Sequence, residues 1–505
     1  MEISDITLIT PPESAPPLES ALAQNPHLTS LPSPKPEVLA PAGLTQTTGT
    51  GEIFKLPEVV SAITSDFIVL PCDLICELEG TAILQTWMTL QSGLGGASGG
   101  IVGDATISHT KGGERSGRRG GMAVWYPTKG LEGVSTKGEE TDFIATTPLP
   151  PPTVPAPEGS LRSNVEKLVM SMPTATVRDI TDEQKTLPIR HMLMKRHGRV
   201  NVKTAHRDAH IYVLPFWALE MMQQNDFDSI AEDVLGWWAK AGWQDGLGDK
   251  LGLRDVLVKG AKTPEGDEGT MSGVLEEEVD LADMSTTSSR TIHQPVRPPS
   301  EGAASRVPES IKSALAPREP MIIPPILAYV QPSITSSRSP LPPLIRRVDT
   351  SSSLLSISLR LAKLPSTNEA AVTGANPSAF SHAAKVAHPD MVEKQSRISE
   401  ADSLVAENVT VGGRVNIKES VIGVGCTIGN GSRLTRCLLM DGVVIGENVT
   451  LTGCILGRRS KVEGGGAKDE DKTRLTDCEV QGGFVVEWGS KSPPSVHHLK
   501  AFANE

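Results

Sequence analysis

Aliphatic residues recur between Val405 and Val480 at a repeated spacing of six, six and five positions. Three steps make a period of 17 residues, and after Val462 the pattern resumes seven residues late. The polar stretch from Gly464 to Glu470 supplies those seven residues, so we expect it to form a loop at one corner. A short period of this kind predicts identical units that stack on one another. The aliphatic positions are Val405, Val411, Ile417, Ile422, Ile428, Leu434, Leu439, Ile445, Leu451, Leu456, Val462, Leu475 and Val480.

A second ladder of small or β-branched residues lies two positions before the aliphatic one, and glycine often follows the aliphatic residue. This is the hexapeptide form typical of a left-handed parallel β-helix, in which each step is one short strand and one corner. The aliphatic residue points inward, and glycine is expected to adopt backbone angles closed to other residues. About four or five coils are predicted, enough for a continuous core. The ladder comprises Val409, Val415, Ser420, Cys426, Ser432, Cys437, Val443, Val449, Cys454, Ser460, Thr473 and Cys478.

The six cysteines, too few and too unevenly placed for a disulfide framework, are interpreted as reduced thiols of a cytosolic protein. Cys437 and Cys454 occupy equivalent places in successive coils, and Cys478 follows after the loop. Stacked thiols can pair or bind metal, but we expect small, inert core residues here. No histidine lies between residues 401 and 490 to complete a metal site or to act as an acyltransferase base. The remaining cysteines are Cys72, Cys76 and Cys426.

The N-terminal part alternates strand and helix patterns, which favours an α/β unit with a parallel sheet. Expected strands are 6–10, 67–70 (of the buried type), 200–202, 211–214 and 321–330, and expected helices are 18–23 and 56–63. Ser229 and Glu232 fit a capping box that opens a further helix. We expect this domain to occupy 1–365, followed by a connector at 366–398, the β-helix at 399–490 and a tail at 491–505.

Three stretches are predicted to be disordered insertions within the first domain: 93–121, 147–157 and 261–318. The first is glycine-rich, the second is proline-rich, and the third opens with eight acids and one lysine between Ala261 and Met284. Such segments bury too little apolar surface to offset the entropy of ordering. The basic cluster Arg115, Arg118 and Arg119 offers contacts to RNA, but without interleaved aromatic residues a solvated loop is expected.

The formal net charge of −12 argues against unaided nucleic-acid binding, because duplex binding relies on neutralising phosphates. No apolar run is long enough to cross a bilayer, and the first residues have no pattern of a secretory signal. We therefore expect a cytosolic protein that binds neither membrane nor nucleic acid directly.

An α/β domain followed by a hexapeptide β-helix resembles sugar-nucleotide pyrophosphorylases and the gamma and epsilon subunits of translation initiation factor 2B. Two segments of the β-helix are most similar to the gamma subunits. The resemblance is absent from the insertions. It lies in Thr48–Glu52, Asp66–Ile75, Arg207–Val213, Phe227–Asp233, Ile417–Gly423 and Cys437–Gly442.

The sequence also departs from the active relatives. Active pyrophosphorylases open with a G-x-G-T-R-type loop whose amides hold the nucleotide phosphates, and this sequence contains no such motif. We expect an N-terminally incomplete nucleotidyltransferase-like domain. An aspartate at the position of Asp73 binds metal in active relatives, but here it is expected to be a polar residue at a strand end. The resemblance thus implies no catalytic, cofactor-binding or metal-binding residues, no cofactor and no enzyme.

The sequence ends at Glu505, soon after the β-helix, where epsilon subunits continue into an exchange domain, so gamma is the better match. The implied role is a scaffold and regulatory subunit in a hetero-oligomer. Its expected partners are the epsilon and other subunits of initiation factor 2B, and the GTPase initiation factor 2. Alternatives are a sugar-nucleotide pyrophosphorylase of the mannose-1-phosphate guanylyltransferase type, its non-catalytic regulatory homologue, a hexapeptide acyltransferase, and a scaffold unrelated to translation.

Overall fold

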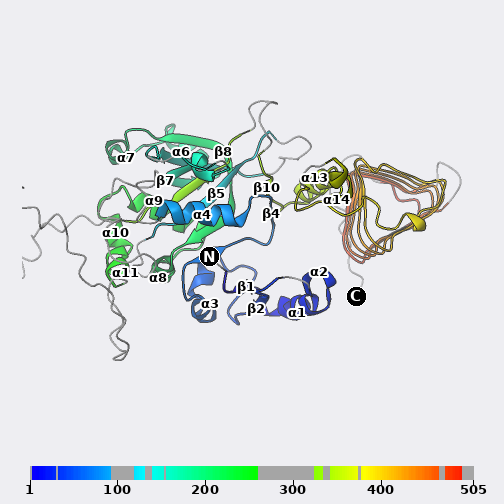
Figure 1. The fold of residues 1–505 in the computed structure, drawn as a ribbon, viewed down its shortest axis with the longest axis horizontal. Helices are drawn as coiled ribbons and strands as arrows, with labels where there is room; N and C mark the ends of the chain where they lie inside the picture. The colour runs from blue at the N-terminus through cyan, green and yellow to red at the C-terminus, as the bar shows by residue number, and fades with distance from the viewer. Residues whose placement is uncertain are drawn as a thin grey trace, which may run out of the picture.

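The computed structural model describes residues 3–29, 32–91, 119–130, 139–152, 155–157, 159–259, 323–333, 342–373, 377–465 and 472–491. An α/β domain and a β-helix lie at opposite ends of the molecule, with helices α13 (Ser351–Ala362) and α14 (Thr367–Thr373) between them (Figure 1). The predicted insertion at 261–318 lies outside the described residues, as does most of the one at 93–121. In the described part of the chain, no helix is long and apolar enough to span a bilayer.

The central sheet of the α/β domain has six strands in the order β3-β8-β5-β9-β7-β6. Among these strands, β5 and β9 run parallel and the other neighbours run antiparallel, so the expectation of a parallel sheet was wrong. The reason is one long strand, β8, where two short ones were expected: its first half pairs with β6 and its second half with β5 and β3. The bounds are β3 Phe67–Val69, β5 Met122–Pro127, β6 Asp142–Pro148, β7 Val165–Pro173, β8 Asn201–Leu214 and β9 Leu327–Val330.

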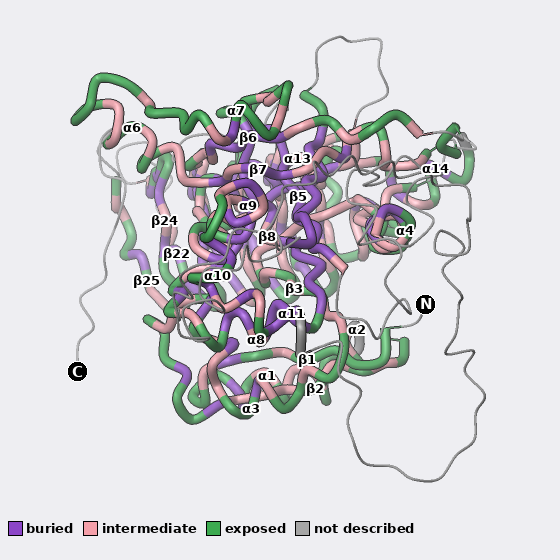
Figure 2. The backbone as a smooth tube through the Cα atoms, turned by 90° about the vertical axis from the view of Figure 1, so that its left-hand side faces the viewer, coloured by how far each residue is buried: buried purple, intermediate pink, exposed green. Residues whose placement is uncertain are grey.

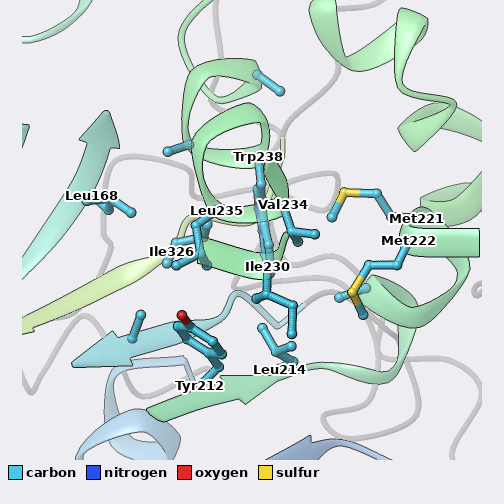
Figure 3. Close-up of a cluster of buried hydrophobic side chains, with 14 of the residues drawn as sticks. Leu168, Tyr212, Leu214, Met221, Met222, Ile230, Val234, Leu235, Trp238 and Ile326 are labelled. Atoms are coloured by element: carbon cyan, nitrogen blue, oxygen red, sulfur yellow. The ribbon is translucent and has the colours of Figure 1, made fainter. Parts of the chain in front are cut away.

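Each face of the sheet carries its own apolar core, because successive side chains of a strand point to opposite faces. Trp125 and Tyr212 belong to the larger cluster, which helices α8 (Phe216–Gln224) and α9 (Leu235–Ala241) cover. Figure 3 shows this cluster, with Trp238 standing between the helix and the strands. On the other face, Trp87 of α4 (Gly80–Gln91) packs in a cluster with Val124 and Val213.

The strand at Phe67–Val69 is not buried as expected. It has one neighbour, β8, and so forms an edge of the sheet, which leaves Ile68 37% and Leu70 62% exposed. Strand β1 (Ile6–Ile9) pairs in parallel with β2 (Pro36–Leu39) in a separate two-stranded sheet beside α1 (Ala15–Gln24). Strand order across the domain therefore depends on pairing partners that the apolar pattern of a single strand does not specify.

Two further expectations in this domain need correction. Thr147 and Pro148, assigned to an insertion at 147–157, are the last residues of β6. The predicted capping box is half right, because the Ser229 hydroxyl accepts a hydrogen bond from the Glu232 amide (3.4 Å) as expected. The returning carboxylate is that of Asp233, which accepts from the Ser229 amide (3.1 Å), since the chain forms a π-turn at Ile230–Val234 before α9.

The C-terminal part is the predicted left-handed β-helix: fifteen short strands form three parallel sheets of five strands each. The predicted register is confirmed, because Ile417 pairs with Leu434 and Leu434 with Leu451. Leu451 then pairs with Leu475, which places the seven extra residues at the predicted corner, although residues 466–471 themselves lie outside the described part. All thirteen predicted inward aliphatic residues are at most 3% exposed (Figure 2). The strands run from β11 (Arg397–Ile398) to β25 (Val485–Val486).

The β-helix begins before the expected boundary at residue 399. Val386 forms a parallel bridge to Val405, and Val392 forms one to Val411, so a first coil lies within the segment expected to be a connector. The segment from Ile398 to Val405 is two residues longer than the regular step, which hid this coil from the periodic pattern. Lys491, expected in the tail, forms a bridge to Arg474, and residues 492–505 lie outside the described part.

The glycine after each aliphatic residue serves a different purpose from the one expected. Its backbone does not adopt a positive φ; a Cβ on Gly429 would instead lie 2.6 Å from the backbone of Gly446 in the next coil. The left-handed corner falls just before each small residue, as at Gly425 (φ 68°) and Asn408 (φ 56°). Close stacking of coils therefore selects glycine at one position and backbone conformation selects it at another.

One face of the β-helix meets the connecting helices. Strands β15 (Val421–Ile422) and β18 (Leu438–Leu439) lie against α13, and the outward side chain of Leu438 is buried there. Lys385 closes the end of α13 by donating hydrogen bonds to the carbonyl groups of Ala362 (2.5 Å) and Leu364. These contacts join the β-helix to the preceding helices.

Candidate functional site

A polar cavity of about 350 Å³ lies on the α/β domain, where β6, β7 and β8 meet the start of α6 (Thr174–Gln184). Carboxyl, hydroxyl and guanidinium groups dominate its lining. It is lined by Glu139, Glu140, Thr141, Asp142, Ser171, Met172, Pro173, Thr174, Ala175, Arg178, Arg207, Asp208, His210, Ser229, Ala231, Glu232 and Arg347.

A bulge in β8 shapes this cavity. The pairing with β5 shifts between Ala123 and Trp125, and opposite this shift His210 has a left-handed backbone with φ 55°. The Asp208 carboxylate accepts hydrogen bonds from the His210 amide (2.8 Å) and from the Tyr212 hydroxyl (2.8 Å). A non-glycine residue in this conformation costs free energy, and such bulges commonly re-aim side chains near functional sites.

Two carboxyl groups lie together at the bulge. The Asp142 carboxylate accepts a hydrogen bond from the Asp208 amide (2.6 Å), and Asp208 is 4% exposed. Burial raises the pKa of Asp142 to about 6. Burial, followed by the charge of Asp142, raises the pKa of Asp208 to about 8. Because two adjacent buried carboxylates cannot both ionise easily, the pair holds a proton near neutral pH.

Two arginines of the same region form ion pairs with carboxylates of this chain. Arg347 donates to both oxygens of Asp73, at 3.0 Å from Nη2 and 3.2 Å from Nε to Oδ2 and 3.4 Å from Nε to Oδ1. Arg207 forms a two-pronged pair with Asp349, at 2.5 and 3.3 Å. Such paired geometry gives the strongest carboxylate contacts that a side chain can make.

His210 completes this network. Its Nε2 lies 3.1 Å from Nη1 of Arg347. Burial, with Arg347 as the next cause, lowers the pKa of His210 to about 4, so the imidazole is neutral at pH 7 and accepts the hydrogen bond. The neutral ring thus links the Asp73–Arg347 pair to the bulge that holds Asp208.

Glu139 faces the same cavity with both carboxylate oxygens buried and without a hydrogen-bond partner among the described residues. Burial raises the pKa of Glu139. A buried acceptor without a partner is unusual in a folded protein and favours a protonated carboxyl or a donor supplied from outside the chain. The cavity therefore suits hydroxyl or amide donors, while Arg207 and Arg347 are already engaged.

Asp73, for which the family resemblance suggested metal binding, forms an ion pair with Arg347. No group of three or more histidine, cysteine, aspartate or glutamate side chains arranged to hold a metal ion is found among the described residues. Sequence reasoning missed Asp142 and Asp349, and it noticed Asp208 only as part of a family segment and not as a site residue. The available signal was the run Arg207–His210, where titratable residues directly precede the apolar end of the strand.

The glycine-rich turn Thr48–Glu52 contacts the segment Phe227–Asp233, so two motifs that carry the family resemblance lie against each other. The Gly51 amide donates to the Asp228 carbonyl (2.7 Å), and the Thr50 hydroxyl accepts from the Ile230 amide (3.1 Å). A Cβ on Gly49 would lie 1.9 Å from Oδ1 of Asp228. This glycine is therefore required by close packing within the domain.

Arg119 is not the solvated loop residue that was expected. Its guanidinium lies 3.5 Å from Asp66 and 5.5 Å from the ring centroid of Trp87, and its carbonyl accepts from the Trp217 indole (2.8 Å). Arg115 and Arg118, the other members of that basic cluster, lie outside the described residues.

All six cysteines are free thiols. Cys426, Cys437, Cys454 and Cys478 are buried in the β-helix, as expected for small core residues, whereas Cys72 is exposed and Cys76 is partly buried.

Residues 399–487 match the family model described as the GMPPB C-terminal domain. The match lies within the β-helix, so this part of the chain is similar to the C-terminal domain of a nucleotidyltransferase-like, hexapeptide-repeat family. A search of the curated proteins finds no match.

Proposed function

We propose that this protein is a non-catalytic scaffold and regulatory subunit of a complex of the initiation factor 2B type. In this proposal the chain works in the cytosol and pairs with an epsilon subunit. It thereby promotes exchange of GDP for GTP on initiation factor 2 without performing chemistry itself.

The proposal rests on the ion pair between Asp73 and Arg347. A metal-dependent nucleotidyltransferase needs its aspartates available for a divalent cation that binds the substrate phosphates. Here Asp73 and Asp349 are each neutralised by an arginine of the same chain, at 3.0 and 2.5 Å. A guanidinium already supplies the positive charge at each carboxylate, which favours a structural role for this region.

The β-helix supports the same proposal. It is a rigid stack with an unbroken inward core, and one of its faces already packs on α13. The other two faces, which carry strands such as β13 (Thr410–Val411) and β17 (Arg433–Thr435), present outward residues that include exposed ones. A rigid surface of this kind is suited to holding subunits in a fixed relation.

The test is reconstitution with an epsilon subunit and initiation factor 2. We expect the two chains to co-elute and GDP release to be faster than with epsilon alone. Ile428→Asp, which places a charge inside the β-helix, should lose both the β-helix and the epsilon subunit. Thr427→Asp, which places a charge outside, should keep the β-helix and serves as the control for folding. Failure of the intact chain to associate would contradict the proposal.

A second assay addresses the pyrophosphorylase alternative. The purified chain is incubated with GTP, mannose 1-phosphate and Mg²⁺, and release of pyrophosphate is followed. We expect no turnover above that of the Asp73→Asn variant. Turnover that depends on Asp73 would replace the proposed scaffold role with an enzyme.

A further inference from the structure

A surface that is both basic and apolar lies on the α/β domain at α7 (His191–Arg196), at the end of the molecule away from the β-helix (Figure 1). We call it the α7 face. Its large apolar side chains are Ile189 (60% exposed), Met194 (51%), Val202 (53%) and Trp237 (39%). The cations of α7 and its flanking residues are Arg190, Lys195 and Arg199, and Lys240 of α9 lies near Arg190.

The α7 face is firmly anchored. Leu193 of α7 is 4% exposed and packs in the cluster that contains Trp243. Arg196 donates to the Gly242 carbonyl (3.3 Å) and pairs with Asp245 (3.2 Å), which fixes α7 beside the end of α9. The exposed side chains therefore project from a preorganised surface, which lowers the entropic cost of binding.

Charge along residues 189–203 is strongly one-sided. Residues 189–203 contain five lysines and arginines and no aspartate or glutamate, in a chain with a net charge of −12. Arg196 and Lys203 are paired with acids of the domain. Arg190, Lys195 and Arg199 form no ion pair with any residue of the described ranges, and Arg190 lies near enough to Lys240 to help lower the pKa of that amine, after burial.

We propose that the α7 face docks an acidic polypeptide segment that carries aliphatic anchors. The cations attract and orient acidic residues, while Met194 and Ile189 supply the apolar contacts that give such interfaces their binding energy. Nucleic acid is a poorer fit, because phosphates make no use of the aliphatic side chains. The one aromatic residue of the face, Trp237, already has Lys240 over its ring at 4.5 Å.

This inference goes beyond the proposed function, since it specifies a surface and a partner chemistry whichever complex the protein joins. The probe is a fluorescent peptide of about 20 residues that combines glutamates with leucine and valine. A peptide of equal charge with glycine in place of the aliphatic residues, a single-stranded RNA, and vesicles rich in phosphatidylserine are compared with it by anisotropy and sedimentation, using the full chain.

We expect the aliphatic acidic peptide to bind most tightly. The affinity for this peptide should fall at least about tenfold in the triple variant Arg190→Glu, Lys195→Glu and Arg199→Glu. The double variant Ile189→Ser and Met194→Ser should bind the aliphatic peptide more weakly and the glycine peptide as tightly as the wild type does. The matched control is Lys418→Glu with Arg433→Glu, two exposed cations of the β-helix whose large apolar strand neighbours, Ile417 and Leu434, are buried. This variant should bind the peptide like the wild type.

Methionine oxidation tests the wild-type chain directly and does not depend on the folding of any variant. Met194 and Met391 are similarly exposed, at 51% and 44%, and only Met194 belongs to the α7 face. The aliphatic peptide should slow peroxide oxidation of Met194 and leave Met391 unchanged. Three results would overturn the inference. They are an unchanged oxidation rate of Met194 in the presence of the aliphatic peptide, equal affinity of all variants for that peptide, and tighter binding of RNA or vesicles than of the peptide.

Discussion

Asp73 and Arg347 are 274 positions apart in the sequence, yet Nη2 of the arginine lies 3.0 Å from Oδ2 of the aspartate. Arg347 is the last residue of β10 (Ile345–Arg347), which pairs antiparallel with β4 (Leu74–Cys76), the strand directly after Asp73. This strand pairing places a guanidinium on the Asp73 carboxylate, and His210 supports it from the β8 bulge.

Removal of this guanidinium should destabilise the domain. Arg347→Ala leaves the largely buried Asp73 carboxylate unpaired, and we expect a loss of about 2 kcal/mol in the free energy of unfolding. Arg347→Lys should lose less, because it keeps the charge but not the fork. Urea unfolding measures both, with the exposed Arg433→Ala as control. Equal stability of Arg347→Ala and the wild type would show that the pair contributes nothing.

The Asp142–Asp208 pair predicts a loss of stability as the pH rises. The folded-state pKa of Asp208, about 8, lies far above its ordinary value of 3.8, so the native state retains a proton that the unfolded chain has lost. Its contribution is complete at low pH and disappears as the pH rises toward and through 8. The buried His210, with a pKa of about 4, acts in the opposite sense but below about pH 6.5, its ordinary value.

The measurement is therefore urea unfolding of the wild type and of Asp208→Asn between about pH 6.5 and 8.5. We expect the wild type to lose about 2 kcal/mol over this window and the asparagine variant to lose much less, since its amide stays neutral. If the free energy of unfolding changed with pH by the same amount in the two proteins, Asp208 would be ruled out as the titrating group.

A charged residue inside the β-helix should destabilise the fold. Ile428 is 1% exposed and sits among the stacked aliphatic residues of neighbouring coils, so Ile428→Asp places a carboxylate in a dry core at a cost of several kcal/mol. We expect insoluble protein or loss of the β-helix melting transition. Its neighbour Thr427 points outward, and Thr427→Asp should melt like the wild type. Normal solubility and melting of Ile428→Asp would contradict the register.

Two glycines should respond differently to alanine. Gly429→Ala brings a Cβ to 2.6 Å from the backbone of Gly446. The clashing atoms all belong to the backbone, which cannot move aside as a flexible side chain could. Gly425 has φ 68° with open space around it, so Gly425→Ala should cost about 1 kcal/mol of backbone strain. Thermal melting should rank Gly429→Ala as the less stable variant, and Gly425→Asn should be close to the wild type. The reverse ranking would mean that backbone conformation outweighs coil stacking.

The cavity shows why site prediction from this sequence was incomplete. Asp208 and His210 were noticed as part of a family segment, but their polar character made β8 look like two short strands. Burial of Asp208 is tolerated because Tyr212 donates to its carboxylate and Asp142 accepts from its amide. Asp142 comes from β6, more than sixty positions earlier, and the His210 ring is paired with the still more distant Arg347. A polar residue in a strand pattern carries no information about which distant group will pair with it.

The amino-acid sequence alone determined the β-helix, its seventeen-residue period and the position of its interrupting loop. It did so because each coil contacts its nearest neighbours along the chain, so local spacing and three-dimensional register are the same quantity. Tertiary structure alone decided the antiparallel sheet, the acid pair at the β8 bulge and the arginine on Asp73. These depend on segments brought together from distant parts of the chain, where burial and the need to satisfy charge, and not any local period, select the partners.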